Sequence, residues 1–139
     1  MTGVRKTAAV ALLAMLGVAA GGLAPAAAAT PGELLPHPGP DGLVWVPERT
    51  GDGGVVSGGA SDRLPTVLTV ACEGGGDVRV TMDSQGTQVA AFTVDCPAGS
   101  AGVGSVSMDP GVVRWGSFAV GVDASHDAVR WSLTVTQPE

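Results

Sequence analysis

Residues 66–96 read TVLTVACEGGGDVRVTMDSQGTQVAAFTVDC, and the strongest structural signal of the chain lies in this stretch. Apolar and polar side chains alternate along it with a period of two, which is typical of half-buried β-strands. Three consecutive glycines at 74–76 and the segment Asp83-Ser84-Gln85-Gly86 interrupt the alternation with turn-forming residues. The second interruption has the chemistry of a turn that closes a β-hairpin. These residues therefore predict short antiparallel strands joined by tight turns.

Two further apolar alternations follow toward the C-terminus, at 118–122 and 129–135. The residues 124–127 between them predict a turn, so that the two segments form a final hairpin in which Val122 pairs with Val129. No segment after the first 29 residues has helical periodicity. About six to seven short strands, with a turn at roughly every tenth residue, predict an all-β fold. We expect a small antiparallel β-sandwich over residues 65–139.

The segment before this predicted domain, residues 30–64, is rich in proline and glycine. Proline lacks the backbone N–H that a helix needs and favours extended backbone, so we expect a non-helical arm. The apolar patch 43–46, Leu-Val-Trp-Val, has the composition of one edge strand. Residues 51–61 hold several glycines and few bulky side chains, which predicts a flexible loop or linker.

Residues 1–29 have the three parts of a secretory signal peptide. Arg5 and Lys6 supply the basic start, an apolar run follows, and small residues end the segment. Cleavage after Ala29 leaves alanine at the first and third positions before the cut, where the peptidase has narrow subsites. The sequence therefore predicts a secreted, extracellular protein with no membrane insertion after cleavage.

Cys72 and Cys96 are the two cysteines of the chain, and each lies in the apolar phase of its predicted strand. A secreted chain with two cysteines most simply pairs them in an internal disulfide bond. The bond would close a loop of about 25 residues, worth about 3–4 kcal/mol in the chain-entropy model. It matters because two Phe, three Trp and no Tyr leave the core with few large side chains.

The chain is acidic, with a formal net charge of −6. Removal of the leader takes away Arg5 and Lys6, which leaves five Arg and no Lys against thirteen acids, a net charge of −8. This charge would repel a polyanion. Nucleic acid and anionic membranes are therefore poor partner candidates, and we expect an extracellular protein or a cell-surface polymer instead.

Three segments carry a resemblance to known sequences: Thr69-Val70-Ala71-Cys72, Phe92-Thr93-Val94-Asp95-Cys96-Pro97 and Trp131-Ser132-Leu133-Thr134-Val135-Thr136. Together with the alanine-rich leader, they resemble the small secreted β-sandwich proteins of high-GC actinobacteria. The resemblance covers residues 65–138. It implies a fold and an extracellular compartment, and it implies no activity.

The sequence contains no constellation that would support catalysis. His37 lies in the proline-rich arm and His126 in a predicted turn, and no Gly-x-Ser-x-Gly motif occurs. Most acidic residues lie in predicted turns, where Asp commonly caps local N–H groups. Asp123 and Asp127 are the best candidates for a calcium site, but no ordered ligand spacing supports one. We therefore predict no enzyme, no catalytic residue, no metal site and no cofactor.

Three side chains are candidates for a binding surface: Trp45, Trp115 and Arg130. Trp45 lies outside the regular alternation, and an exposed Trp is a frequent interface anchor. Arg130 is predicted to lie over Gly121 on the outer face of the final hairpin, where its guanidinium could fork onto a carboxylate. In the alternation, Trp115 falls on the opposite face from the apolar residues of the strand that follows, and a β-bulge at Gly116 would turn its side chain to the core. Trp45 is the favoured candidate, because the core does not need it.

We expect a non-catalytic extracellular interaction or structural module. One alternative is a secreted inhibitor of an extracellular hydrolase, which would present a rigid loop to its target. Another alternative is a carbohydrate-binding module. The core position predicted for Trp131 leaves only Trp45 and Trp115 to stack on a sugar, and this weakens that alternative.

Overall fold

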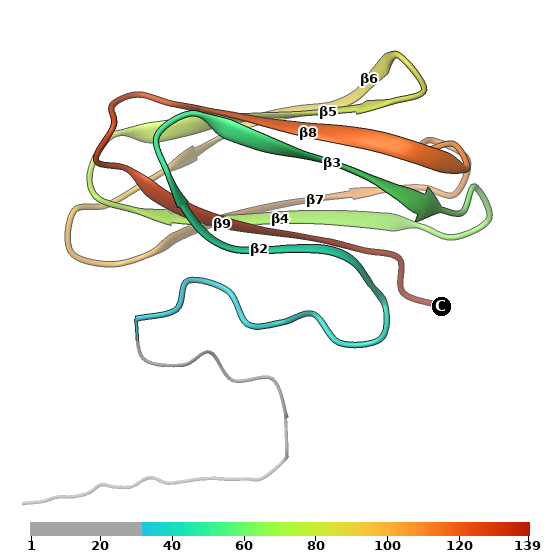
Figure 1. The fold of residues 1–139 in the computed structure, drawn as a ribbon, viewed down its shortest axis with the longest axis horizontal. Helices are drawn as coiled ribbons and strands as arrows, with labels where there is room; N and C mark the ends of the chain where they lie inside the picture. The colour runs from blue at the N-terminus through green and yellow to red at the C-terminus, as the bar shows by residue number, and fades with distance from the viewer. Residues whose placement is uncertain (1–31) are drawn as a thin grey trace, which may run out of the picture.

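The computed structural model describes residues 32–139, which form two packed β-sheets of four strands each (Figure 1). The strands are β2 (Gly42–Thr50), β3 (Gly53–Ala60), β4 (Thr66–Glu73), β5 (Asp77–Ser84), β6 (Thr87–Asp95), β7 (Gly102–Met108), β8 (Gly116–Ala124) and β9 (Arg130–Thr136). These residues contain no helix that could span a membrane, and the predicted signal peptide at 1–29 lies outside them. The predicted antiparallel β-sandwich is confirmed.

One sheet has the order β2-β9-β4-β7 and the other has the order β3-β8-β5-β6, which is the arrangement of an eight-stranded jelly roll. Two strands pair with each other when they lie the same number of strands before and after the β5–β6 turn. The nested antiparallel pairs are β5 with β6, β4 with β7, β3 with β8, and β2 with β9. The chain is therefore one long hairpin that is rolled into two layers.

The turn between β5 and β6 forms the tip of this long hairpin. Its two central residues, Gln85 and Gly86, have φ angles of 52° and 83°, and Ser84 pairs with Thr87 across the turn. Two-residue turns with positive φ at both centres match the twist of the strands that they join. The hairpin predicted from the segment 83–86 is therefore confirmed.

The predicted final hairpin is wrong, because β8 and β9 lie in different sheets. β8 pairs with β3 and β5, whereas β9 pairs with β2 and β4. The alternation did identify the faces that the strands bury, since Phe118, Val120, Trp131 and Leu133 are all buried. Alternation determines which face points inward, and it does not determine which strand lies alongside. These side chains therefore face one another across the core.

The predicted linker at 51–61 is also wrong, because most of it forms β3, and the predicted edge strand at 43–46 extends to the whole of β2. The sandwich thus begins at β2 and not at residue 65. Close packing accounts for two of its glycines. A Cβ on Gly53 would lie 2.9 Å from the Trp131 ring, and one on Gly54 would lie 2.5 Å from Val120 O. Glycine is required here by the approach of neighbouring atoms.

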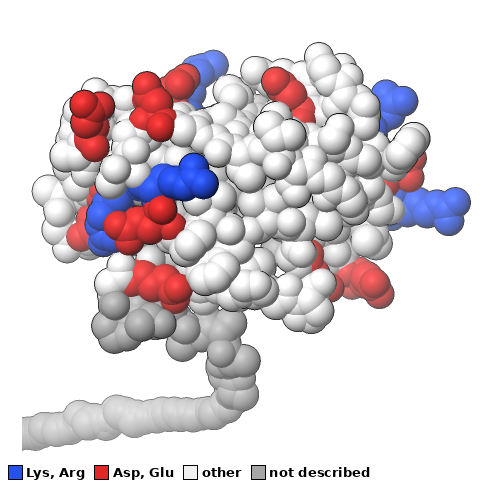
Figure 2. All heavy atoms as spheres, in the orientation of Figure 1, with Lys and Arg blue, Asp and Glu red and all other residues white. Residues whose placement is uncertain are grey.

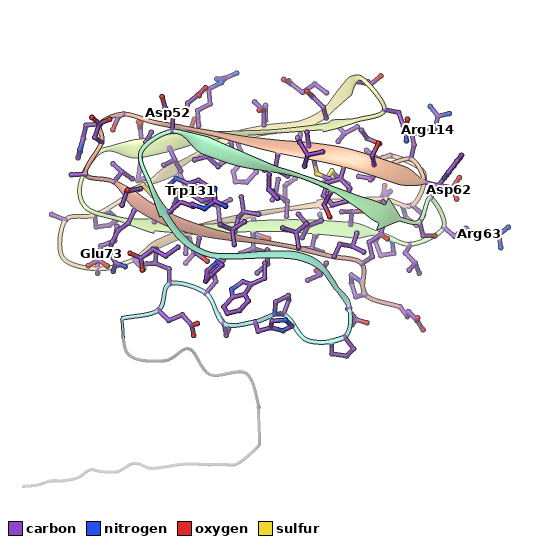
Figure 3. All side chains as sticks on the ribbon, in the orientation of Figure 1. Asp52, Asp62, Arg63, Glu73, Arg114 and Trp131 are labelled. Atoms are coloured by element: carbon purple, nitrogen blue, oxygen red, sulfur yellow. A yellow bond between two sulfur atoms is a disulfide. The ribbon has the colours of Figure 1, made fainter. Side chains whose placement is uncertain are left out.

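The core between the sheets consists largely of valine, and Trp131 is the largest fully buried side chain (Figure 3). Its Nε1 donates a hydrogen bond of 2.8 Å to Gly51 O, so its buried polar atom is satisfied. The predicted disulfide bond is confirmed between Cys72 and Cys96. Cys72 belongs to β4 and Cys96 follows β6, so the bond joins one sheet to the other.

Reduction of the disulfide bond should lower the free energy of unfolding by about 3–4 kcal/mol, because the unfolded chain then regains the entropy of a loop of about 25 residues. Urea unfolding followed by Trp fluorescence, with and without reductant, measures this loss. The double variant Cys72→Ala, Cys96→Ala is the control, and reductant should leave its stability unchanged. A loss below about 1 kcal/mol would contradict the role given to the bond.

Candidate functional site

The loop between β7 and β8, residues 109–115, carries the most exposed aromatic side chain of the described residues. Trp115 is 69% exposed and Val112 is 41% exposed, whereas Val113 is only 1% exposed and fixes the loop to the core. Trp115 therefore points to solvent and not to the side of Val113, so the predicted bulge that would bring both to the core is wrong. Instead, β8 starts at Gly116 with a φ of 100°, which reorients the chain.

Two hydrogen bonds from the tip of the long hairpin hold this loop in place. Ser84 Oγ, which is buried, accepts a hydrogen bond of 2.8 Å from Arg114 N, and Gln85 Nε2 donates one of 2.9 Å to Trp115 O. An isolated bridge between Pro110 and Val113 closes the loop on itself. Because the backbone is fixed on both sides of Trp115, the indole is exposed on an ordered support.

The loop between β3 and β4, residues 61–65, lies beside the Trp115 loop. Ala60 pairs with Gly116 and Thr66 pairs with Met108, so both segments cross between the sheets at the same end of the sandwich. Asp62, Arg63 and Arg114 project from this end away from the core (Figure 3). We call residues 61–65 and 109–115 together the Trp115 end.

The arginines of the Trp115 end differ from Arg130 in their surroundings. Arg63 and Arg114 are exposed and are not in an ion pair within residues 32–139, whereas Arg130 pairs with Glu48 and Glu73. Trp and Arg are both enriched in protein interfaces, and this end of the sandwich carries an exposed indole and two guanidinium groups. The Trp115 end therefore offers aromatic and cationic contacts without the need to break a salt bridge.

Trp45, the favoured candidate from the sequence, contacts the chain's own N-terminal segment. It lies on β2 between the buried Val44 and Val46, so its side chain points away from the core. Its Nε1 donates a hydrogen bond of 3.2 Å to Leu35 O, and the His37 ring stands edge-on to it at 5.0 Å. The indole is half-buried, and residues 33–39 of the same chain already occupy the surface that it would offer to a partner.

Arg130 is paired within the molecule and does not lie over Gly121, because these residues belong to different sheets. Its Nη1 lies 3.0 Å from Glu48 Oε1, and its Nη2 donates a hydrogen bond to Glu73. The hydrogen bond to Glu73, and then that to Glu48, raise the pKa of Arg130 above its ordinary value. The guanidinium of Arg130, which was expected to bind a partner's carboxylate, instead joins β2, β4 and β9.

The described residues 32–139 contain no enclosed pocket and no cluster of three potential metal-ligating side chains. No protein-family model matches the chain, and no curated protein matches its sequence. Fold and site together define a disulfide-linked antiparallel jelly roll that exposes a tryptophan on a fixed loop.

The sequence did not reveal that Arg63 lies at the same end of the sandwich as Trp115, nor that Ser84 and Gln85 support the loop. Asp109-Pro110-Gly111 did indicate a turn here. The supports lie 30 residues away in the chain, so no local pattern could have revealed them.

Replacement of Trp45 by Ala should lower the melting temperature by roughly 5 °C or more, because it removes the hydrogen bond to Leu35 and the contact with His37. Trp115→Ala is the matched control, and it should melt within about 1–2 °C of the wild type, because the indole is mostly exposed. Differential scanning calorimetry measures both. An unchanged melting temperature for Trp45→Ala would show that the segment 33–39 does not stabilise β2.

Proposed function

We propose that this chain is a secreted, non-catalytic interaction module that binds an extracellular partner through the Trp115 end. The observation that carries the proposal is the 69% exposure of Trp115 on a loop whose backbone is fixed by Ser84 and Gln85. Trp and Arg are the residue types most enriched in binding hot spots. A contact surface that is already ordered loses little conformational entropy when it binds.

The net charge favours a partner that is not a polyanion. Without the predicted leader the chain carries five Arg and thirteen acids, so an extracellular protein or a neutral cell-surface polymer suits it better than nucleic acid. Jelly rolls also serve as capsid and lectin domains. This is an analogy of fold that is compatible with a binding role and assigns no ligand.

Secretion is supported by the leader at 1–29 and by the disulfide bond, which is compatible with an extracellular location. Mass spectrometry of the culture medium should find a mature form that begins near Thr30. An intact N-terminus that fractionates with membranes would contradict the proposed compartment.

Replacement of Trp115 by Ala should reduce recovery of the partner at least tenfold, since a hot-spot Trp is worth about 2 kcal/mol or more. The purified mature chain is immobilised and exposed to culture medium and to cell-wall fractions, and retained material is quantified by mass spectrometry. Val56→Ala is the control, because Val56 is 78% exposed on β3, away from this end. Equal recovery with wild type and Trp115→Ala would show that the Trp115 end is not the contact surface.

The fixed loop also favours one second function, a secreted inhibitor of an extracellular hydrolase. Inhibitors present an ordered loop to their target, and residues 109–115 form a loop that is exposed except at Val113 and is closed by the Pro110–Val113 bridge. A panel of secreted proteases and glycosidases separates the two functions. Stoichiometric inhibition that is lost in Trp115→Ala would favour the inhibitor over a plain binding module.

A further inference from the structure

The sandwich has four edge strands: β2 and β7 in one sheet, and β3 and β6 in the other. Edge strands carry unpaired backbone groups, and natural proteins protect them with charge, proline, bulges or a covering segment. β2 contains Pro47, Glu48 and Arg49, and residues 33–39 lie over its Trp45. This edge therefore has several of these protections at once.

The two edges of the other sheet are protected by irregular pairing. The register of β3 against β8 shifts between Ser57 and Ala60. The register of β6 against β5 shifts opposite Met82 and Asp83, and β6 ends in the charged residue Asp95. Such irregularities twist an edge and oppose the pairing of a further strand.

β7 has none of these protections. Its sequence, GVGSVSM, contains no charged residue and no proline. It pairs with β4 in unbroken register, from Thr66 opposite Met108 to Cys72 opposite Gly102. Val103, the second residue of β7, is 62% exposed. β7 is therefore a flat and uncharged edge that presents an apolar side chain to solvent.

We infer that β7 is the edge through which two copies of this chain associate, with one β7 antiparallel to the other. The pairing would join the two β2-β9-β4-β7 sheets into one continuous sheet of eight strands. Addition of a strand to an exposed sheet edge is an established mode of recognition, in which main-chain hydrogen bonds supply the affinity. An antiparallel pair of identical strands is self-complementary, as a two-fold dimer interface must be.

The charge distribution argues for a second copy at this edge. Two copies of this acidic chain, each with a net charge of −8 without the predicted leader, repel each other, so they associate most readily where neither carries charge. The opposite edge of the sandwich, where β2 and β3 lie, is shown in Figure 2 and carries both acidic and basic side chains. Ser105, the middle residue of β7, lies about 14 Å along the strand from Asp109, which exceeds the Debye length of about 8 Å in physiological salt.

Sedimentation equilibrium of the mature chain between about 10 μM and 1 mM tests the proposal, since weak interfaces of this kind dissociate in that range. The wild type should show a monomer–dimer equilibrium. Val103→Glu should weaken association at least tenfold, because it adds like charges beside the two-fold axis. Val56→Glu is the matched control on the β3 edge, and Trp115→Ala is the control for the proposed binding site. Both should associate as the wild type does.

Hydrogen exchange of the wild type supplies a test that needs no substitution. The amides of β7 should gain protection as the protein concentration rises, while those of β3 should not. A wild type that stays monomeric at 1 mM would overturn the proposal. It would also be overturned if Val56→Glu weakened association as much as Val103→Glu. Pairing of β7 with an added peptide but not with a second copy of the chain would overturn it as well. None of these outcomes bears on binding through Trp115.

Discussion

The turn at Gln85 and Gly86 is the constraint on which the rest of the sandwich depends. Both residues have positive φ, which folds β6 back along β5 and sets the register of the first pair. The other three nested pairs then follow outward from this point. The same turn also supports the exposed surface, since Ser84 and Gln85 bond to the backbone of Arg114 and Trp115. One local conformation thus determines both the topology and the position of the candidate site.

The three side chains that were predicted from the sequence to bind a partner differ in their surroundings in the structure. Trp45 is covered by residues 33–39 and contributes to the attachment of that segment. Arg130 joins two glutamates from neighbouring strands. Trp115 alone among the three is mostly exposed, because its loop lies at the end of the sandwich, where strands cross between sheets. The partner surface is therefore proposed at the end of the fold and not on its faces.

The sequence allowed the sandwich, the disulfide bond and the β5–β6 hairpin to be predicted, because alternation and turn chemistry are local. It could not show which strands are neighbours: Val122 and Val129 are both buried as expected, yet Val122 belongs to β8 and Val129 directly precedes β9, which lies in the other sheet. β3 escaped prediction because glycine gives no periodic signal, and Gly53 and Gly54 are explained only by the nearby Trp131 ring and Val120 carbonyl. Trp115 was ambiguous because its exposure depends on supports 30 residues away.

The pairing of β2 with β9 has a consequence for biogenesis. These strands lie at opposite ends of the described chain, so their pairing has the largest sequence separation of the strand pairs. Such non-local pairing makes folding slow, because loop-closure entropy must be overcome before the contacts form. The proposed export, led by the N-terminus, would deliver β2 first and β9 last. In that case β2 would stay unpaired on the far side of the membrane until translocation is complete.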